Sequence, residues 1–395
     1  MLPRALWARE RLLKRQGQEG GHGSLETGYG TITPTLDDQP KETGAHAALT
    51  CTGLLGKDWM SKLDDETLIS ALTIPGTHDS AAYKYSWPFV RTQKLDISQQ
   101  LDAGIRYFDL RCGIRNDIVE MVHGPSLLGI TLGEVLDTMY LWLASHETEA
   151  LIVQIKQDRP AERSNVHFAE AIWKALTLKP ERWRTANTTP ALGELRGKIQ
   201  LLRRFSGPRL HAYGIDVTKW QDNPSRPFTI YTWHGVRLTI QDHYSFPDPE
   251  SLPSLVTKKG GDVAELLTSA FADPHTGHWY INFVSAYEFN LYYQLTPREI
   301  ALGGWWAFRW EDGMNLRLRN YLQERGGKRR FGIVAMDFPE SGATDLIDTL
   351  IVSNFANAAD SRSWYTLALD LLMFMLVALV LTFVSLIYFG PFSAR

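Results

Sequence analysis

One pattern recurs between residues 72 and 338: a short apolar run, a polar residue where the run ends, and a longer stretch with helical spacing or turn residues. Runs of strand length that alternate with helical segments, such as residues 132–143, predict a parallel sheet. The number of runs favours a barrel over an open sheet, so we predict an α/β fold, an irregular (β/α) barrel of the TIM type. The runs cover residues 72–74, 105–110, 118–122, 151–155, 198–202, 239–241, 279–284 and 331–336.

Polar and charged residues mark the C-terminal ends of these runs. In a barrel those ends converge on one rim, so residues far apart in the sequence form one cluster. Each alone has an ordinary structural explanation, since a single histidine is usually structural and an aspartate often caps a helix. Their repeated placement favours a shared functional pocket. The set comprises His78, Asp79, Asp109, Arg111, His123, Lys156, Arg204, Asp242 and Asp337.

Two histidines in one pocket indicate acid–base chemistry. Imidazole titrates near neutral pH, so one ring can take a proton from an attacking hydroxyl while the other gives one to the leaving oxygen. Phosphodiester cleavage needs both transfers and a fixed cation for the phosphorus oxygens, supplied by a metal or an arginine. Arg111 lies two residues after Asp109, so both can face the barrel mouth. A metal site would prefer a second carboxylate there, so we expect no metal.

Three sequence blocks carry most of these residues: Ile-Pro-Gly-Thr-His-Asp-Ser at 74–80, Phe-Asp-Leu-Arg at 108–111 and His-Gly-Pro at 123–125. Further blocks follow at residues 155–156, 196–198, 201–206, 241–244, 280–283 and 337. In this order they resemble the X domain of phosphatidylinositol-specific phospholipase C in its bacterial, metal-independent form. The resemblance covers about residues 59–350, and so many ordered blocks are more specific than any single short motif.

The resemblance implies a role for each residue of the pocket. It also implies a phosphatidylinositol-type lipid as the substrate, and no cofactor. The implied catalytic residues are His78, the general base towards the inositol 2-hydroxyl; Asp337, which orients it; His123, the general acid for the diacylglycerol oxygen; Asp79, which assists His123; Arg111, which binds the phosphate; and Asp109, which positions Arg111. The implied contacts to the inositol hydroxyls are Lys156, Arg204, Asp242 and Tyr244.

The sequence departs from the family pattern in several places. Residues 208–228 and 286–316 match poorly, and we expect them to form loops at the rim. Cys112 replaces a glycine of the family, but no group with an implied role is lost. Trp305 and Trp306 fit two interpretations: an interfacial wedge at the level of lipid headgroups, or partly buried aromatic residues under a loop.

The ends of the chain differ in character from this catalytic region. Residues 1–56 lack apolar periodicity and mix basic with Gly-rich and Thr/Pro-rich stretches, which predicts a disordered arm. Its opening lacks an apolar segment of signal-peptide length, so nothing there argues for secretion. We expect the barrel over residues 57–352, a linker over 353–370 and a short tail over 390–395.

The segment 371–389, from Leu371 to Phe389, contains 19 residues without a charge. As a helix it would span roughly 28 Å at about 1.5 Å per residue, enough to cross a bilayer. It is either a retained single-pass anchor or a glycolipid-anchor signal that is cleaved. A cleaved signal needs an entry signal at the N-terminus, so we favour the retained anchor and expect a membrane location, in a membrane that the sequence does not identify.

Composition and the intact pocket reduce the number of functions that the chain could have. The formal net charge of −3 provides no basic surface for a polyanion, which argues against nucleic acid as a partner. Cys51 and Cys112 are expected to be free thiols. The leading hypothesis is a membrane-anchored phosphodiesterase that converts phosphatidylinositol or a glycosyl-phosphatidylinositol to diacylglycerol and an inositol cyclic phosphate. The alternatives are a catalytically silent inositide-binding protein and a metal-dependent glycerophosphodiesterase-like enzyme. The first is disfavoured because all key positions, both histidines and Arg111 included, are intact, and the second because Arg111 stands where a metal site wants a carboxylate.

Overall fold

The computed structural model describes residues 56–207, 213–289 and 294–355. The expected N-terminal arm, apart from its last residue, lies outside the described residues. So do most of the expected linker, the apolar segment 371–389 and the tail. No helix within the described residues combines the length and the hydrophobicity needed to traverse a membrane.

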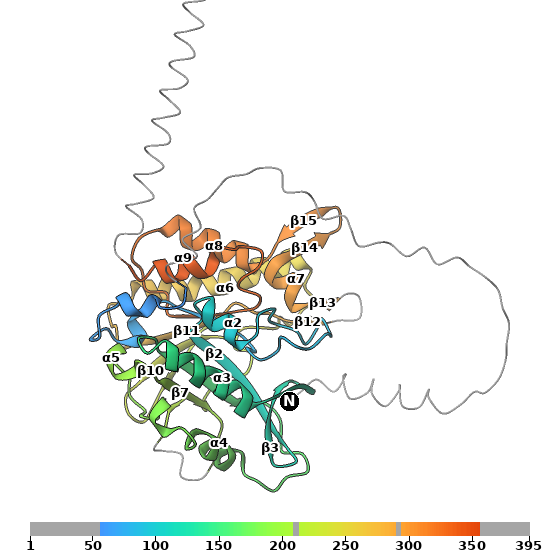
Figure 1. The fold of residues 1–395 in the computed structure, drawn as a ribbon. Helices are drawn as coiled ribbons and strands as arrows, with labels where there is room; N and C mark the ends of the chain where they lie inside the picture. The colour runs from blue at the N-terminus through green and yellow to red at the C-terminus, as the bar shows by residue number, and fades with distance from the viewer. Residues whose placement is uncertain (1–55, 208–212, 290–293, 356–395) are drawn as a thin grey trace, which may run out of the picture. The chain divides into compact units, whose positions relative to one another are not determined.

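A 12-stranded sheet forms the framework of the described chain, with two small hairpins beside it (Figure 1). Each of the eight apolar runs overlaps a strand of this sheet, the run 72–74 only at Ile74. The strands of the sheet are β1 Ile74–Thr77, β2 Tyr107–Arg115, β3 Ile118–His123, β4 Ser126–Thr131, β5 Leu151–Gln157, β6 Trp183–Arg184, β7 Ile199–Arg204, β8 Ile215–Asp216, β9 Phe228–Tyr231, β10 Arg237–Gln241, β11 Trp279–Phe283 and β16 Ile333–Met336. The hairpins are β12 Glu288–Phe289 with β13 Gln294–Leu295, and β14 Gly303–Trp306 with β15 Arg309–Asp312.

The strand order is β6-β7-β5-β2-β1-β16-β11-β10-β9, with β8 beside β7 and β4 beside β3. Neighbouring strands from β6 to β10 run parallel, and β9 is antiparallel to β10. Among the described residues no ladder joins β6 or β8 to β9, so the sheet curls into a partial barrel rather than a closed one. The α/β barrel prediction is therefore confirmed in its parallel core but not in closure, because β8 is two residues long and β9 runs the opposite way.

Helices cover the outside of the curved sheet, with α6 against β10 and β11 and α9 against β1. In Figure 1, α3 and α4 lie on one side of the molecule and α6, α8 and α9 on another. The helices are α2 Ile97–Asp102, α3 Leu132–Ser145, α4 Phe168–Leu176, α5 Leu192–Leu195, α6 Leu252–Ala272, α7 Pro297–Leu302, α8 Met314–Arg325 and α9 Leu346–Val352, with short 3₁₀ turns at Trp59–Lys62, Ile69–Ala71 and Pro180–Arg182.

Strand β16 shows why these runs carry no polar alternation. Ile333 and Ala335 pack into the larger hydrophobic core, whereas Val334 and Met336 pack into a second core with residues of α6, α8 and α9. Successive side chains of a strand point to opposite faces, and both faces of a parallel sheet are covered. An uninterrupted apolar run is therefore the expected sequence of such a strand.

Two expectations from the sequence need correction. The run 118–122 belongs to β3, which pairs antiparallel with β2 and is not one of the parallel strands. It folds back over a tight turn at Asn116 and Asp117, which both have positive φ angles. The segment 286–316, expected to form rim loops, contains two hairpins and α7, and α8 begins within it.

Candidate active site

The C-terminal edge of the sheet brings His78 and Asp337 together. Strand β1 lies between β2 and β16, and Thr77 pairs with Met336 across the parallel ladder. The next residues on these two strands, His78 and Asp337, are therefore neighbours, although they are 259 positions apart in the sequence. The His78 Nδ1 atom lies 2.8 Å from Asp337 Oδ1.

Burial sets the protonation of this pair. It lowers the pKa of His78 to about 4, with the positive charge of Arg111 acting in the same direction. Burial also raises the pKa of Asp337 well above its usual range. One proton lies between Nδ1 and Oδ1; with Asp337 ionised it belongs to Nδ1, and Nε2 of the neutral ring is then free to accept a proton. That nitrogen lies 3.4 Å from Asp79 Oδ2.

His123 reaches the same edge from the β2–β3 hairpin, of which it is the last residue. Its Nδ1 atom lies 2.6 Å from the Val90 carbonyl oxygen. Because a carbonyl can only accept, Nδ1 carries a proton and donates it. Nε2 lies 3.5 Å from Asp79 Oδ2, and the rings of His78 and His123 are 6.5 Å apart between centroids, nearly perpendicular.

Arg111 sits between two buried carboxylates. Its Nε atom donates to Asp109 Oδ2 at 3.1 Å, and its Nη1 atom lies 3.2 Å from Asp79 Oδ2. Burial opposes the charged form, but the two carboxylates outweigh it and raise the pKa of Arg111 well above its usual value. The guanidinium is therefore a permanent cation, fixed in direction at the mouth of the barrel.

Asp79 occupies the point where these groups converge. It is 2% exposed, and its φ angle of 42° lies in the left-handed region that non-glycine residues avoid. Its Oδ2 atom has no hydrogen-bond partner among the described residues, although nitrogens of Arg111, His78 and His123 lie within 3.5 Å. Backbone strain and an unmet buried acceptor at one residue are features that cluster at functional sites.

A row of three cations crosses neighbouring strands. Arg111 of β2 pairs in register with Lys156 of β5, which pairs with Arg204 of β7. Each has a carboxylate nearby: Lys156 Nζ lies 2.5 Å from Asp158 Oδ1, and Arg204 Nη2 lies 3.6 Å from Asp242 Oδ2. The row makes this side of the pocket polar, with charges that nearly balance.

The remaining predicted residues line the edge next to Arg204. Trp220 donates from Nε1 to Asp242 Oδ2 at 2.8 Å, and the Arg204 guanidinium lies 4.1 Å over the Trp220 ring. Tyr244 lies further out and donates its hydroxyl to Asp222 Oδ1 at 2.8 Å. The structure thus gathers the predicted residues at one edge, with Tyr244 at its margin. No group of three His, Cys, Asp or Glu side chains in the described residues is arranged to hold a metal ion.

Comparison with known proteins shows which family the chain resembles. Residues 72–205 match the family model described as phosphatidylinositol-specific phospholipase C, X domain. Over these residues the chain resembles the X domain of that family. A 1-phosphatidylinositol phosphodiesterase of Staphylococcus aureus (strain Newman) is 26% identical over 314 residues, covering 75% of this chain and 94% of that protein. The protein of the same name from Listeria monocytogenes is 28% identical over 302 residues, covering 72% of this chain and 81% of that protein.

Solved structures agree with this assignment. A phosphatidylinositol-specific phospholipase C of S. aureus superposes with a TM-score of 0.65 at 25% identity, over 76% of this chain and 98% of that one. The L. monocytogenes enzyme superposes with a TM-score of 0.54 at 27% identity, over 76% and 99% of the two chains. The X domain of this chain therefore has the α/β fold of the bacterial enzymes.

Several residues that shape the site escaped sequence reasoning. Gln93 donates from Nε2 to the carbonyl oxygens of His78 at 2.7 Å and Met336 at 2.9 Å, tying the two strand ends together. Asp158 and the Val90 carbonyl are further examples. The contact to His123 uses a main-chain atom of Val90 and therefore has no residue signature in the sequence. Only Asp158, two positions after Lys156 and thus on the same face of the strand, offered a usable signal.

Proposed function

We propose that the X domain of this chain is a metal-independent phosphodiesterase that cleaves phosphatidylinositol, or a glycosylated form of it, to diacylglycerol and an inositol cyclic phosphate. The observation that carries the proposal is the Arg111 guanidinium, fixed by carboxylates beside two imidazole rings that are 6.5 Å apart. Relatives named 1-phosphatidylinositol phosphodiesterase support it.

In the proposed reaction His78 and His123 act in one step. His78 Nε2 takes the proton of the inositol 2-hydroxyl, whose oxygen then forms a bond to phosphorus. The bond from phosphorus to the glycerol oxygen breaks, and His123 Nε2 gives that oxygen a proton. Asp337 holds the His78 ring through Nδ1, so that Nε2 faces the substrate, and Asp79 lies beside the Nε2 atom of His123.

Arg111 would stabilise the charge that develops on the phosphorus oxygens. A planar guanidinium matches two phosphate oxygens at once, and its fixed direction avoids reorganisation during the reaction. The nearly balanced charges of Lys156, Arg204 and Asp242, together with Tyr244, suit an uncharged polyol, which favours inositol hydroxyls as their ligands.

A lipid substrate is supported by exposed aromatic side chains on the β14–β15 hairpin. Trp305 is 73% exposed and Phe308, at the tip, is 99% exposed. Aromatic side chains of this kind favour the headgroup zone of a bilayer. Trp306 is half-buried and packs against the core. We therefore assign the interfacial wedge to Trp305 and regard Trp306 as a partly buried structural residue. Loss of vesicle binding in a Trp305→Ala, Phe308→Ala protein would support the wedge, and unchanged binding would contradict it.

Turnover in the presence of a chelator tests the proposal. The full chain is incubated with phosphatidylinositol micelles in EDTA, and cyclic inositol phosphate is followed by phosphorus NMR. We expect turnover in EDTA and its loss in His78→Ala. If product forms only after calcium or magnesium is added, the protein is a metal-dependent diesterase and the proposal fails. Absence of turnover in both conditions would favour a catalytically silent binding protein.

We also propose that residues 371–389 retain the protein in a membrane as a single-pass C-terminal anchor. The support is the uncharged sequence of the segment, which is long enough to span a bilayer. Mass spectrometry of the mature protein tests this proposal. A C-terminal peptide containing the segment is expected in the carbonate-resistant membrane fraction, whereas a mature chain that ends before residue 371 would indicate a cleaved glycolipid-anchor signal.

A further inference from the structure

Asn315 lies behind Asp337 and has no role in the proposed reaction. It is the second residue of α8 and is fully buried. Its Nδ2 atom donates to three main-chain carbonyl oxygens, those of Asp337 at 3.0 Å, Phe338 at 2.9 Å and Ser341 at 3.3 Å. One side-chain amide therefore bonds to three carbonyl groups of the turn that follows β16.

The turn contains an unfavourable backbone conformation that requires stabilising contacts. Phe338 has a φ angle of 45°, in the left-handed region, which is unfavourable for a residue with a side chain. Such conformations persist only where surrounding bonds impose them. Here the bonds are those from Asn315 and one from the Phe338 N–H group to the Thr92 carbonyl oxygen at 3.0 Å. The direction in which Asp337 projects depends on the same bonds, because it is the residue before Phe338.

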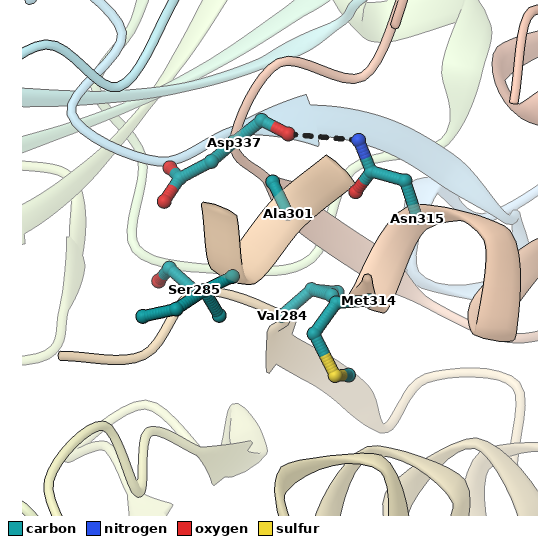
Figure 2. A pocket seen from close by; sticks show the side chains of 7 residues that line it. Val284, Ser285, Ala301, Met314, Asn315 and Asp337 are labelled. Carbon is teal, nitrogen blue, oxygen red and sulfur yellow. Dashed lines mark hydrogen bonds between the residues drawn. The ribbon is translucent and has the colours of Figure 1, made fainter. Parts of the chain in front are cut away.

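The side chains of Asp337 and Asn315 are packed closely against their neighbours, with no space for water between them. Asp337, Asn315 and Ser285 line a narrow crevice with no room for a water molecule, and Figure 2 shows their side chains around it. The Asn315 Oδ1 atom has no hydrogen-bond partner among the described residues. Asn315 is thus held through its amide nitrogen alone, in tightly packed surroundings beside the buried Asp337.

We infer that Asn315 is a positioning residue for the proposed general base: it fixes the main chain at Asp337 so that the carboxylate meets His78 Nδ1. The inference rests on the proposed function for its catalytic meaning. Asn315 does not touch the pocket where substrate would bind, so it acts through Asp337 alone.

A double-mutant cycle tests this dependence. Asn315→Leu keeps the side-chain size and removes the donors, and we expect kcat to fall about 10- to 100-fold, with KM within about twofold, because small misplacements of a catalytic group have effects of this order. In the Asp337→Asn background, the same change should lower kcat less than about threefold. An equal loss in both backgrounds would show that Asn315 acts on the fold in general, and the inference would fail.

Asn354→Leu is the matched control. Asn354 is also buried, and its amide nitrogen donates to the carbonyl oxygens of Thr73 at 2.8 Å and Ile351 at 3.1 Å, before the start of β1. We expect this variant to lose thermal stability but to keep kcat. If Asn315→Leu does not fold, Asn315→Ser replaces it in the double-mutant cycle. Serine keeps one donor on a shorter side chain, so the expected loss of kcat is smaller.

A spectroscopic readout separates failure of this inference from failure of the proposed function. In ¹⁵N-histidine spectra, assigned with His78→Ala, the His78 Nδ1 resonance is expected to shift in Asn315→Leu and to stay unchanged in Asn354→Leu. An unchanged resonance in Asn315→Leu would overturn the inference whether or not the protein turns over lipid. Absence of turnover in the wild-type protein would overturn only the proposed function.

Discussion

Replacement of Arg111 by lysine separates charge from geometry at the proposed phosphate site. The guanidinium uses two different nitrogens, Nε towards Asp109 and Nη1 towards Asp79. An ammonium has one nitrogen and cannot serve both carboxylates and two phosphate oxygens. Loss of one charge-assisted hydrogen bond costs about 1.5–3 kcal/mol. At about 1.4 kcal/mol for each factor of ten, kcat/KM should fall about 10- to 150-fold.

The assay is the initial rate of cyclic phosphate formation in EDTA, measured beside the thermal midpoint of unfolding. Arg184→Lys is the matched control. Arg184 donates to the Thr188 carbonyl oxygen, Gln200 Oε1 and Glu194 Oε2, and it lies near the opposite end of the sheet. We expect Arg184→Lys to lower the midpoint and to leave kcat/KM unchanged. A rate for Arg111→Lys within threefold of wild type would refute bidentate phosphate binding.

Three further predictions follow from the geometry. His78→Ala and His123→Ala should each lose at least about 100-fold in rate; a substrate whose leaving group needs no proton should restore His123→Ala but not His78→Ala, and the reverse pattern would exchange their roles. Since burial lowers the pKa of His78 to about 4, the ring takes up its second proton only as the pH falls towards 4, so the acid limb of kcat/KM should lie there; a limb centred near 6.5 would contradict this. Gly235→Ala, at φ 80° with open space around the new methyl group, should cost about 1–2 kcal/mol in urea unfolding. Gly332→Ala should cost more, because its φ is 74° and the methyl group would lie 2.5 Å from the Tyr280 carbonyl oxygen; equal losses would show that the main chain relaxes.

The sequence predicted the strands of the core and the residues at their ends. Each run is apolar because both faces of the strand are covered, and the parallel register then carries residues such as His78 and Asp337 to one edge. That location follows from topology and needs no knowledge of the loops. The roles of these residues stay predictions until they are tested by substitution.

Strand direction and closure could not be read from the same runs. An apolar run does not reveal whether its strand is parallel or antiparallel to its neighbours, so the sequence placed β3 among the parallel strands. The turn at Asn116 and Asp117 offered a signal, since both residue types accept positive φ angles in a hairpin. Closure depends on β8, which is only two residues long, and on the direction of β9, which its sequence does not reveal. Contacts such as Val90 to His123 use main-chain atoms and have no residue signature.

The position of β16 has a consequence for how the domain is made. This strand is the last of the sheet in the chain, yet it lies between β1 and β11 in the middle of it. Until it inserts, the two halves of the sheet share no ladder at that place, and His78 has no Asp337 beside it. A growing chain therefore completes its fold and its proposed general base in the same late event. Catalytic competence should thus appear together with the final cooperative gain in stability, not before it.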